Sequence, residues 1–176
     1  DDLPWIPQLI DWLRAARGRT RLVGICFGHQ AMAHAFGGTV EKSDKGWGVG
    51  LHRYDIRSDE PWMHPRARTL SVPVSHQDQV VTAPPDARVI ASSGFTPYAG
   101  LAWGEDAISF QCHPEFQPEY AAALVESRRG HRIADAVADE AVASLARPND
   151  RPVLTAWIRA FLLLTPPPVE TDGSGI

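Results

Sequence analysis

One short segment, Gly-Ile-Cys-Phe-Gly-His-Gln at residues 24–30, constrains the fold of this chain more than any other. It follows a mostly apolar run at 21–25, which is typical of a strand buried in a parallel sheet. A helical pattern of apolar residues starts immediately afterwards, at Phe27. Cys26 therefore lies in a sharp turn from strand to helix, with a glycine two residues before it and another two residues after it. Small residues let chain segments pass closely at such a turn, which predicts an α/β fold with Cys26 at the ligand-binding edge of the sheet.

The rest of the chain fits the same class of fold. Helical spacing of apolar residues predicts helices over residues 4–17, 27–36, 117–129, 132–146 and 151–164. Short alternating runs, separated by turn residues, predict strands over residues 48–56, 69–75, 79–82, 88–92, 100–103 and 107–111. We predict a flavodoxin-like open sheet that is mostly parallel, with flanking helices and a small region of antiparallel strands.

Length and composition predict one globular domain over residues 1–165, followed by a disordered Pro-rich tail over 166–176. With 17 Lys and Arg against 21 Asp and Glu, the net charge is −4, which argues against a nucleic-acid binder because phosphate binding needs clustered basic residues. The longest apolar stretch, near 157–164, is too short to span a bilayer. Two cysteines are too few for a disulfide framework and lack the spacing of a zinc site. Without a recognisable signal peptide, they favour the cytoplasm.

The turn itself predicts a nucleophilic role for Cys26. A helix N-terminus favours the thiolate form of a cysteine over the thiol. The backbone N–H of Phe27 would point towards an oxyanion formed on a carbonyl that the sulfur attacks. The alternative is that Cys26 is a small buried apolar residue, as free cysteines often are. The two flanking glycines favour the nucleophile.

A nucleophilic cysteine needs a base and a group that orients the base, and His113 and Glu115 are the candidates. Residues two apart on an extended segment point to the same side, and Pro114 favours extended geometry at His113. Both side chains can then face one crevice, where the carboxylate fixes the imidazole tautomer. The alternative is a strand-terminal histidine and a solvated glutamate. Cys112 is one residue out of phase with His113, and we predict that it lies in the core.

Residues 24–30 and the His-Pro-Glu sequence at 113–115 resemble the two signatures of class I (triad-type) glutamine amidotransferases. These are the glutaminase domains of GMP synthase, anthranilate synthase and carbamoyl-phosphate synthetase. Gly-Trp-Gly-Val-Gly at 46–50 resembles the glycine-rich strand of the family, and Ser-His-Gln-Asp at 75–78 resembles a glutamine-holding segment of GMP-synthase-like members. Ordinary strand glycines and a polar turn are the alternatives for these two segments. The resemblance covers residues 3–116.

The resemblance implies Cys26 as nucleophile, His113 as general base and acid, and Glu115 as the residue that orients His113. The reaction that it implies is hydrolysis of the glutamine side-chain amide through a γ-glutamyl thioester, with release of ammonia and without a cofactor or metal. The substrate-binding residues that we predict are Phe27, Gly28, Gln30, His76 and Gln77. For Gln30 an ordinary position on a helix face is the alternative. His29 and His76 also have simpler interpretations, as a helix-surface residue and a turn residue.

Family members normally have a strand and a glycine-rich loop ahead of the first helix, and this loop supplies a second oxyanion N–H. Nothing before Gly24 matches that loop, so we expect a longer natural protein. The favoured function is a glutaminase that releases ammonia for an acceptor on a synthetase partner, because the chain has no Gly-x-x-x-x-Gly-Lys-Ser/Thr loop for ATP. The alternatives are a stand-alone γ-glutamyl hydrolase or peptidase, and a catalytically idle regulatory subunit of the same fold.

Overall fold

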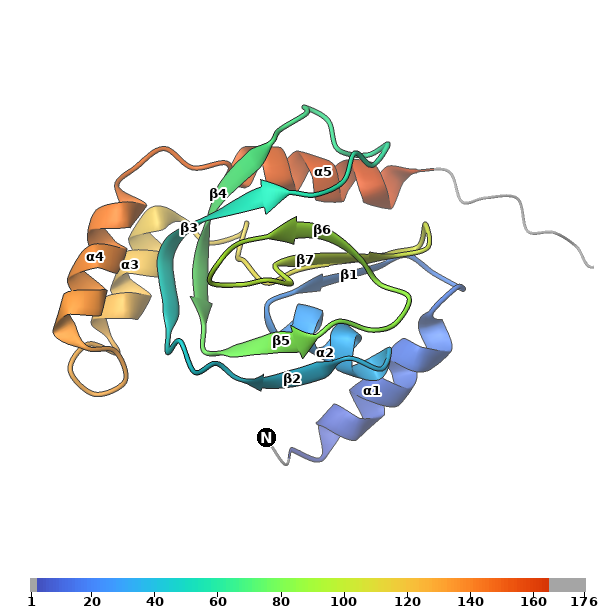
Figure 1. The fold of residues 1–176 in the computed structure, drawn as a ribbon, viewed down its shortest axis with the longest axis horizontal. Helices are drawn as coiled ribbons and strands as arrows, with labels where there is room; N and C mark the ends of the chain where they lie inside the picture. Colours follow the sequence, from blue (N-terminus) through green and yellow to red (C-terminus); the bar gives the residue numbers. More distant parts are fainter. Residues whose placement is uncertain (1–2, 165–176) are drawn as a thin grey trace, which may run out of the picture.

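A computed structural model describes residues 3–164, and Figure 1 shows its helices and strands. The helices are α1 (Trp5–Ala16), α2 (Phe27–Ala35), α3 (Pro118–Glu126), α4 (Asp135–Leu145) and α5 (Arg151–Leu163). The strands are β1 (Leu22–Ile25), β2 (Thr39–Lys42), β3 (Gly48–Ile56), β4 (Thr69–His76), β5 (Asp78–Thr82), β6 (Arg88–Ser92), β7 (Gly100–Trp103) and β8 (Ala107–Phe110). Every predicted helix and strand is present within a few residues of its expected bounds, whereas β2 was not predicted. The predicted tail at 166–176 lies outside the described residues.

The main sheet has six strands in the order β1-β8-β7-β6-β3-β4, and only the β1–β8 pair is parallel. Strands β2 and β5 form a separate antiparallel pair. The α/β class is confirmed, but the prediction of a mostly parallel sheet is wrong. Parallel neighbours need a long crossover connection, usually a helix. The segments 57–68, 93–99 and 104–106 join successive strands that are neighbours in the sheet, and none of them contains a helix.

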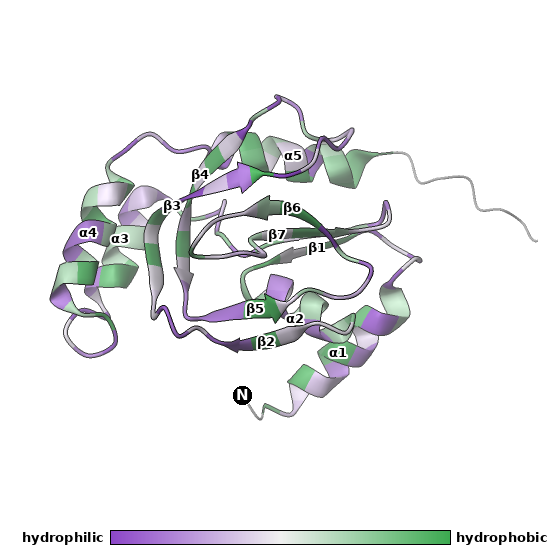
Figure 2. Ribbon diagram, in the orientation of Figure 1, coloured by the Kyte–Doolittle hydropathy of each residue, from purple (hydrophilic) through white to green (hydrophobic). Residues whose placement is uncertain are grey.

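Both faces of the main sheet are buried, and alternate residues of β7 show the two sides. Leu101 and Trp103 contact the cluster formed with α1 and α2, whereas Ala102 belongs to the cluster under α5. Figure 2 shows the hydrophobic colouring that this burial produces along β6 and β7. The sheet therefore lies between two helical layers. Helix α2, which follows Cys26, packs on one face of the sheet together with α1.

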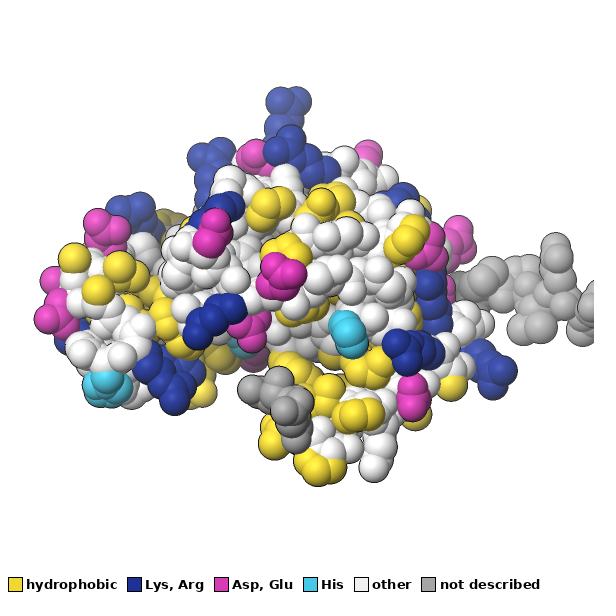
Figure 3. Space-filling model, turned by 60° about the horizontal axis from the view of Figure 1, so that its bottom comes forward, with side chains coloured by type: hydrophobic (Ala, Val, Ile, Leu, Met, Phe, Trp, Pro, Cys, Tyr) yellow, Lys and Arg dark blue, Asp and Glu magenta, His cyan; other side chains and the backbone are white. Residues whose placement is uncertain are grey.

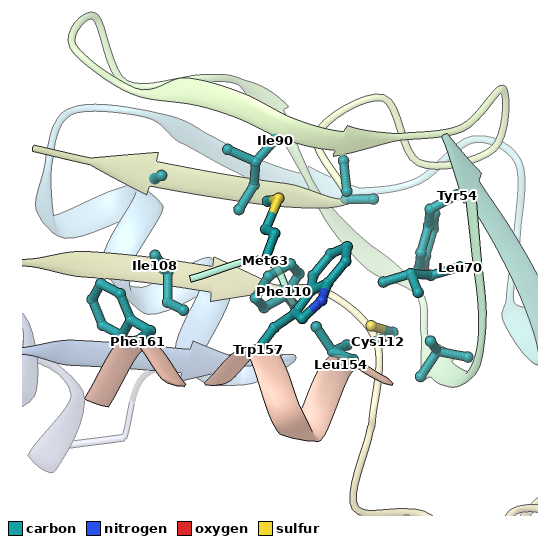
Figure 4. Packing of buried hydrophobic residues seen from close by; sticks show 14 of the residues in the cluster. Tyr54, Met63, Leu70, Ile90, Ile108, Phe110, Cys112, Leu154, Trp157 and Phe161 are labelled. Atoms are coloured by element: carbon teal, nitrogen blue, oxygen red, sulfur yellow. The ribbon is translucent and has the colours of Figure 1, made fainter. Parts of the chain in front are cut away.

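Helix α5 docks through the apolar face predicted for residues 151–164. Leu154, Trp157 and Phe161 are fully buried, and the indole N–H of Trp157 donates to the carbonyl of Pro65 at 2.8 Å. Figure 4 shows these three side chains beneath the strand that carries Ile108 and Phe110. The start of α5 is thereby fixed close to the chain that leaves β8.

Helices α3 and α4 cover a different part of the sheet, beside β3 and β4 (Figure 1). Their apolar residues form a small cluster of their own with Val49 of β3; its helical members are Val125, Ala138 and Ala141. The amide N–H of Leu51 donates to the hydroxyl of Ser144 at 2.8 Å, which ties α4 to β3. This helix pair therefore flanks the segment that follows β8.

Candidate active site

Cys26 occupies the junction between β1 and α2 in a strained backbone conformation. Its φ of 48° and ψ of −102° make it the one non-glycine residue with positive φ within residues 3–164. Such a conformation costs on the order of 1–3 kcal/mol and persists only where the surrounding structure enforces it. The strand-to-helix turn predicted from residues 24–30 is therefore present, with the sulfur at the N-terminus of α2.

The two glycines of this turn have different tasks. A Cβ atom at Gly24 would lie 2.6 Å from the carbonyl oxygen of Gly28 and 2.6 Å from the sulfur of Met32. Only glycine fits there, because the first turn of α2 passes directly over β1. A Cβ atom at Gly28 would meet nothing within 4 Å. Gly28 thus leaves open space two residues from the cysteine, and no other segment touches it there.

The parallel pair β1–β8 brings the predicted base to the cysteine. Ile25 pairs with Phe110, and the next amide, the N–H of Cys26, donates to the carbonyl of Phe110 at 2.9 Å. His113 follows three residues after the end of β8, and its N–H donates to the carbonyl of Pro73 in β4 at 2.8 Å. Carboxyl ends of parallel strands meet at one edge, so Cys26 and His113 leave the sheet side by side.

His113 is held by Glu115 and by an aromatic neighbour. Its Nδ1 lies 2.6 Å from Oε1 of Glu115, and its ring stacks on Phe116 with centroids 3.9 Å apart and planes 6° apart. The His113 side chain is only 12% exposed, while that of Glu115 is 53% exposed. Cys26 is the second side chain, besides Glu115, that raises the pKa of the imidazole. His113 is therefore held by Glu115 at the edge of the sheet where Cys26 also lies.

His113 and Glu115 each stabilise the charged form of the other. Burial lowers the pKa of His113, but its hydrogen bonds with Cys26 and Glu115 outweigh that effect and raise the pKa to about 9. For Glu115 burial acts to raise the pKa, yet the hydrogen bond from His113 and the charges of His113 and Arg151 hold it below its usual value. At neutral pH His113 is therefore an imidazolium, held beside the Glu115 carboxylate.

The side chain of Gln30 extends from α2 towards the same edge of the sheet. Its Nε2 donates to the carbonyl of Asp78 at 2.8 Å and to Oε1 of Gln111 at 3.2 Å. Gln111 is fully buried, and its Nε2 lies 3.6 Å from the sulfur of Cys26. Gln111 was not predicted as a site residue. The alternation that pairs His113 with Glu115 also includes Gln111, two residues earlier, and this signal could have found it.

Two other predicted substrate-binding residues, His76 and Gln77, lie at the end of β4 and directly after it. The ring of His76 is buried and packs edge-on against Phe95, with centroids 6.1 Å apart. The carbonyl of Gln77 accepts a hydrogen bond from Ser43 at 2.9 Å. From the same segment, the carbonyl of Ser75 lies nearest the cysteine, 4.0 Å from its sulfur.

Phe27, the first residue of α2, has its side chain on the surface. The side chain is 44% exposed and packs edge-on against Trp5, with centroids 5.5 Å apart. Leu3 and Trp12 are also exposed near this end of the chain, where Figure 3 shows hydrophobic side chains gathered. An apolar surface thus adjoins the elbow, while the backbone N–H of Phe27 remains at the helix N-terminus.

Two further expectations concern neighbours of the site. Cys112 is fully buried beside Leu154 (Figure 4), as predicted, and burial raises the pKa of its thiol. The expectation that His29 lies on a helix surface is wrong. His29 is fully buried, with its Nδ1 2.7 Å from the hydroxyl of Ser109, because α2 packs this face directly on β8.

Metal ligands and membrane-spanning helices can be assessed over residues 3–164. That part of the chain holds no group of three or more His, Cys, Asp or Glu that could bind a metal ion. None of its helices combines the length and apolar character that crossing a bilayer requires.

Comparison with known proteins places this chain among the glutamine amidotransferases. The family model for class-I glutamine amidotransferases matches residues 3–128. A glutamine amidotransferase-like protein of Schizosaccharomyces pombe is 28% identical over 166 residues, which cover 92% of this chain and 66% of that protein. Gamma-glutamyl peptidase 3 of Arabidopsis thaliana is 29% identical over 132 residues, 71% of this chain and 53% of the peptidase.

A bacterial relative and a solved structure extend this comparison. The GMP synthase of Alkalilimnicola ehrlichii is 37% identical over 149 residues, 79% of this chain and 27% of the synthase. The chain thus spans about a quarter to two thirds of the length of these three relatives. The crystal structure of a glutamine amidotransferase from Thermotoga maritima has the same fold, with a TM-score of 0.74 at 18% identity, over 92% of this chain and 71% of that one. The chain therefore belongs to the class-I glutamine amidotransferase family, whose members are generally glutamine amide hydrolases.

Proposed function

We propose that this protein hydrolyses the side-chain amide of glutamine and releases ammonia for transfer to an acceptor on a partner. The observation that carries this proposal is the arrangement of three side chains at one sheet edge. Cys26 lies in a strained turn at a helix N-terminus, His113 follows the parallel neighbouring strand at the same edge, and Oε1 of Glu115 lies 2.6 Å from Nδ1 of His113. This is the constellation that a thiol nucleophile needs.

The proposed reaction has two halves. The Cys26 thiolate attacks the amide carbonyl carbon, and the backbone N–H of Phe27 stabilises the oxyanion of the tetrahedral intermediate. Imidazolium at His113 gives its proton to the departing nitrogen, so ammonia leaves and a γ-glutamyl thioester remains. Neutral His113 then takes a proton from water while the oxygen attacks the thioester. Collapse releases glutamate and restores the thiolate and the imidazolium.

Residues around the sulfur would hold the rest of the substrate. Gln30 and Gln111 form a hydrogen-bonded pair beside Cys26, and their amides offer donors and acceptors to a polar amino-acid head group. The backbone around Gln77 and the open space at Gly28 lie at the same end of the sheet. We assign the ring of His76 a supporting task instead, because it packs against Phe95.

The proposed partner is a synthetase domain or subunit that consumes the ammonia. Relatives of this chain include the GMP synthase of Alkalilimnicola ehrlichii and one of the GMP synthase subunits of Methanospirillum hungatei, which is 31% identical over 112 residues. Their names describe a glutamine-hydrolysing synthase. A similar division of labour for this protein is our proposal.

A second function is supported by the relative from Arabidopsis thaliana. That protein is a gamma-glutamyl peptidase, and its match covers 71% of this chain. The same triad would cleave a γ-glutamyl peptide if the leaving group were the amine of an amino acid instead of ammonia. A catalytically idle regulatory role is disfavoured by the complete Cys–His–Glu arrangement.

A substrate panel on the full-length protein tests the proposal. Glutamine and a series of γ-glutamyl dipeptides would be assayed for ammonia and amino-acid release, with and without a candidate synthetase. Ammonia release from glutamine that the synthetase stimulates supports the proposed function. Strong dipeptide cleavage without any partner supports the peptidase instead. No turnover of any compound would leave only the regulatory role.

The pH dependence of the rate should reflect His113. Its imidazolium form protonates the leaving nitrogen, so glutaminase activity should fall as pH rises through about 9, where His113 loses its proton. Glu115→Gln removes the carboxylate that raises this pKa, so the alkaline decline should move to lower pH. Initial rates across neutral and alkaline pH measure the shift. Glu119→Gln, an exposed change on α3, is the matched control, and an equal shift there would contradict the assignment.

A further inference from the structure

The guanidinium of Arg151, the first residue of α5, bridges the two ends of the segment that contains Glu115. Its Nε donates to the carbonyl of Pro114 at 2.9 Å, and its Nη1 donates to Oε1 of Gln117 at 3.0 Å. Two donors in a fixed planar fork hold both acceptors in one geometry, which a single ammonium group cannot do. The short segment between Pro114 and Gln117 is therefore closed by a side chain from another element.

The start of α5 is itself fixed to the strand that holds His113. The carboxylate of Asp150 accepts the N–H of Ser71 at 2.7 Å, and the N–H of Asp150 donates to the carbonyl of Ser71 at 2.8 Å. Two residues further along β4, the carbonyl of Pro73 accepts the N–H of His113. The hydrogen bonds thus form a closed brace that runs from β4 through α5 to the His113 segment and back to β4.

The charge of Arg151 also acts on this segment. The titratable groups that face His113 and Glu115 are Cys26 at the elbow, His76 at the end of β4, buried Cys112 and Arg151. Burial raises the pKa of Glu115, and the hydrogen bond from His113 together with the charge of Arg151 lowers it. The charge of Arg151 therefore acts on this segment at Glu115, whose carboxylate lies 2.6 Å from Nδ1 of His113.

We propose that Arg151 is a positioning residue that sets the geometry of Glu115 and, through it, the orientation of the His113 ring. The inference rests on the proposed function, because it concerns the same catalytic segment. A role confined to folding would also make Arg151 variants less stable. It would not change the pH at which the Cys26 sulfur becomes reactive in protein that remains folded.

The test uses three variants of the full-length protein: Arg151→Ala, Arg151→Lys and Arg159→Ala. Arg159 lies two turns further along α5, and no hydrogen bond or ion pair of its side chain is present within residues 3–164, which makes it the matched control. Two properties would be measured at a temperature where all variants are folded. One is kcat and KM for glutamine. The other is the pH midpoint for alkylation of Cys26 by iodoacetamide, followed by mass spectrometry.

We expect Arg151→Ala to lower kcat by about 10- to 100-fold with little change in KM, since small displacements of a catalytic group cost this much. Its alkylation midpoint should move to higher pH, because a loosened Glu115 stabilises the imidazolium less. Arg151→Lys should recover part of kcat, since an ammonium can reach Pro114 or Gln117 but cannot bridge them. Arg159→Ala should behave as the unchanged protein.

The proposal is overturned if Arg151→Ala keeps the normal kcat and midpoint, or loses only thermal stability. An equal midpoint shift in Arg159→Ala would overturn it as well. Alkylation needs no substrate, so it separates the two hypotheses. Suppose that the protein hydrolyses no amide, but Arg151→Ala alone still shifts the pH midpoint for alkylation of Cys26. That result would refute the proposed function and support the role of Arg151. An active protein with an unmoved midpoint would refute the brace alone.

Discussion

Replacement of Cys26 by alanine is expected to reduce glutamine hydrolysis by at least about 10⁴-fold, because removal of the nucleophile of a catalytic triad eliminates the covalent pathway. The fold should survive this change. Alanine removes one sulfur atom from a partly exposed position, and the turn is enforced by the packing of Gly24 rather than by the thiol. The comparison needs purified full-length protein, with ammonia release measured at saturating glutamine.

Cys112→Ala is the matched control for this experiment, since it removes the chain's other cysteine. Cys112 is fully buried and contacts no catalytic group by hydrogen bond, so this variant should retain glutaminase activity. A diazo-ketone analogue of glutamine should label Cys26 in the unchanged protein and leave Cys112 unmodified. Undiminished activity in Cys26→Ala, or label found only on Cys112, would refute Cys26 as the nucleophile.

Gly24→Ala is expected to destabilise the fold by about 2–3 kcal/mol, which corresponds to a fall in Tm of roughly 4–12 °C for a chain of this size. The added Cβ would lie 2.6 Å from a backbone carbonyl and from the Met32 sulfur. The sulfur sits on a flexible side chain and can move. The carbonyl of Gly28 belongs to the first turn of α2, which must shift, and it would carry Cys26 out of place.

Gly28→Ala adds the same methyl group to the same turn and is the control for stability. Its Cβ would meet no atom within 4 Å, and alanine favours a helix over glycine by roughly 1 kcal/mol. Thermal unfolding of both variants, followed by circular dichroism, measures the contrast. A Gly24→Ala protein with an unchanged Tm would show that α2 can move away from β1 without cost.

The elements of this fold were predictable from local patterns, whereas their arrangement was not. Residues 48–56, for example, form β3 over the predicted bounds. Strand β2 was missed because its four residues are mostly exposed and show no apolar alternation; it is ordered by pairing with β5. Strand direction depends on which distant segments pair. The sequence of an apolar strand such as β1 does not indicate which strand will pair with it, or in which direction.

Some features of the candidate site were likewise predictable from the sequence, and others were not. The spacing around Cys26 and the alternation of His113 with Glu115 identify candidate residues because both are properties of short segments. The brace at Arg151 is invisible at that level, since it arises only when α5 docks on the sheet and brings residue 151 to Pro114. His29 was misplaced because helical periodicity does not reveal that a second face of α2 is covered by β8.

The parallel pairing of β1 with β8 has a consequence for when this chain becomes chemically active. Ile25 and Phe110, which pair directly, are 110 − 25 = 85 residues apart in sequence. Closing so long a loop is entropically costly and belongs to the slower, non-local steps of folding. Until that pairing forms, the segment that carries His113 is not held beside Cys26. Fast alkylation of Cys26 would therefore report the closure of the sheet during refolding.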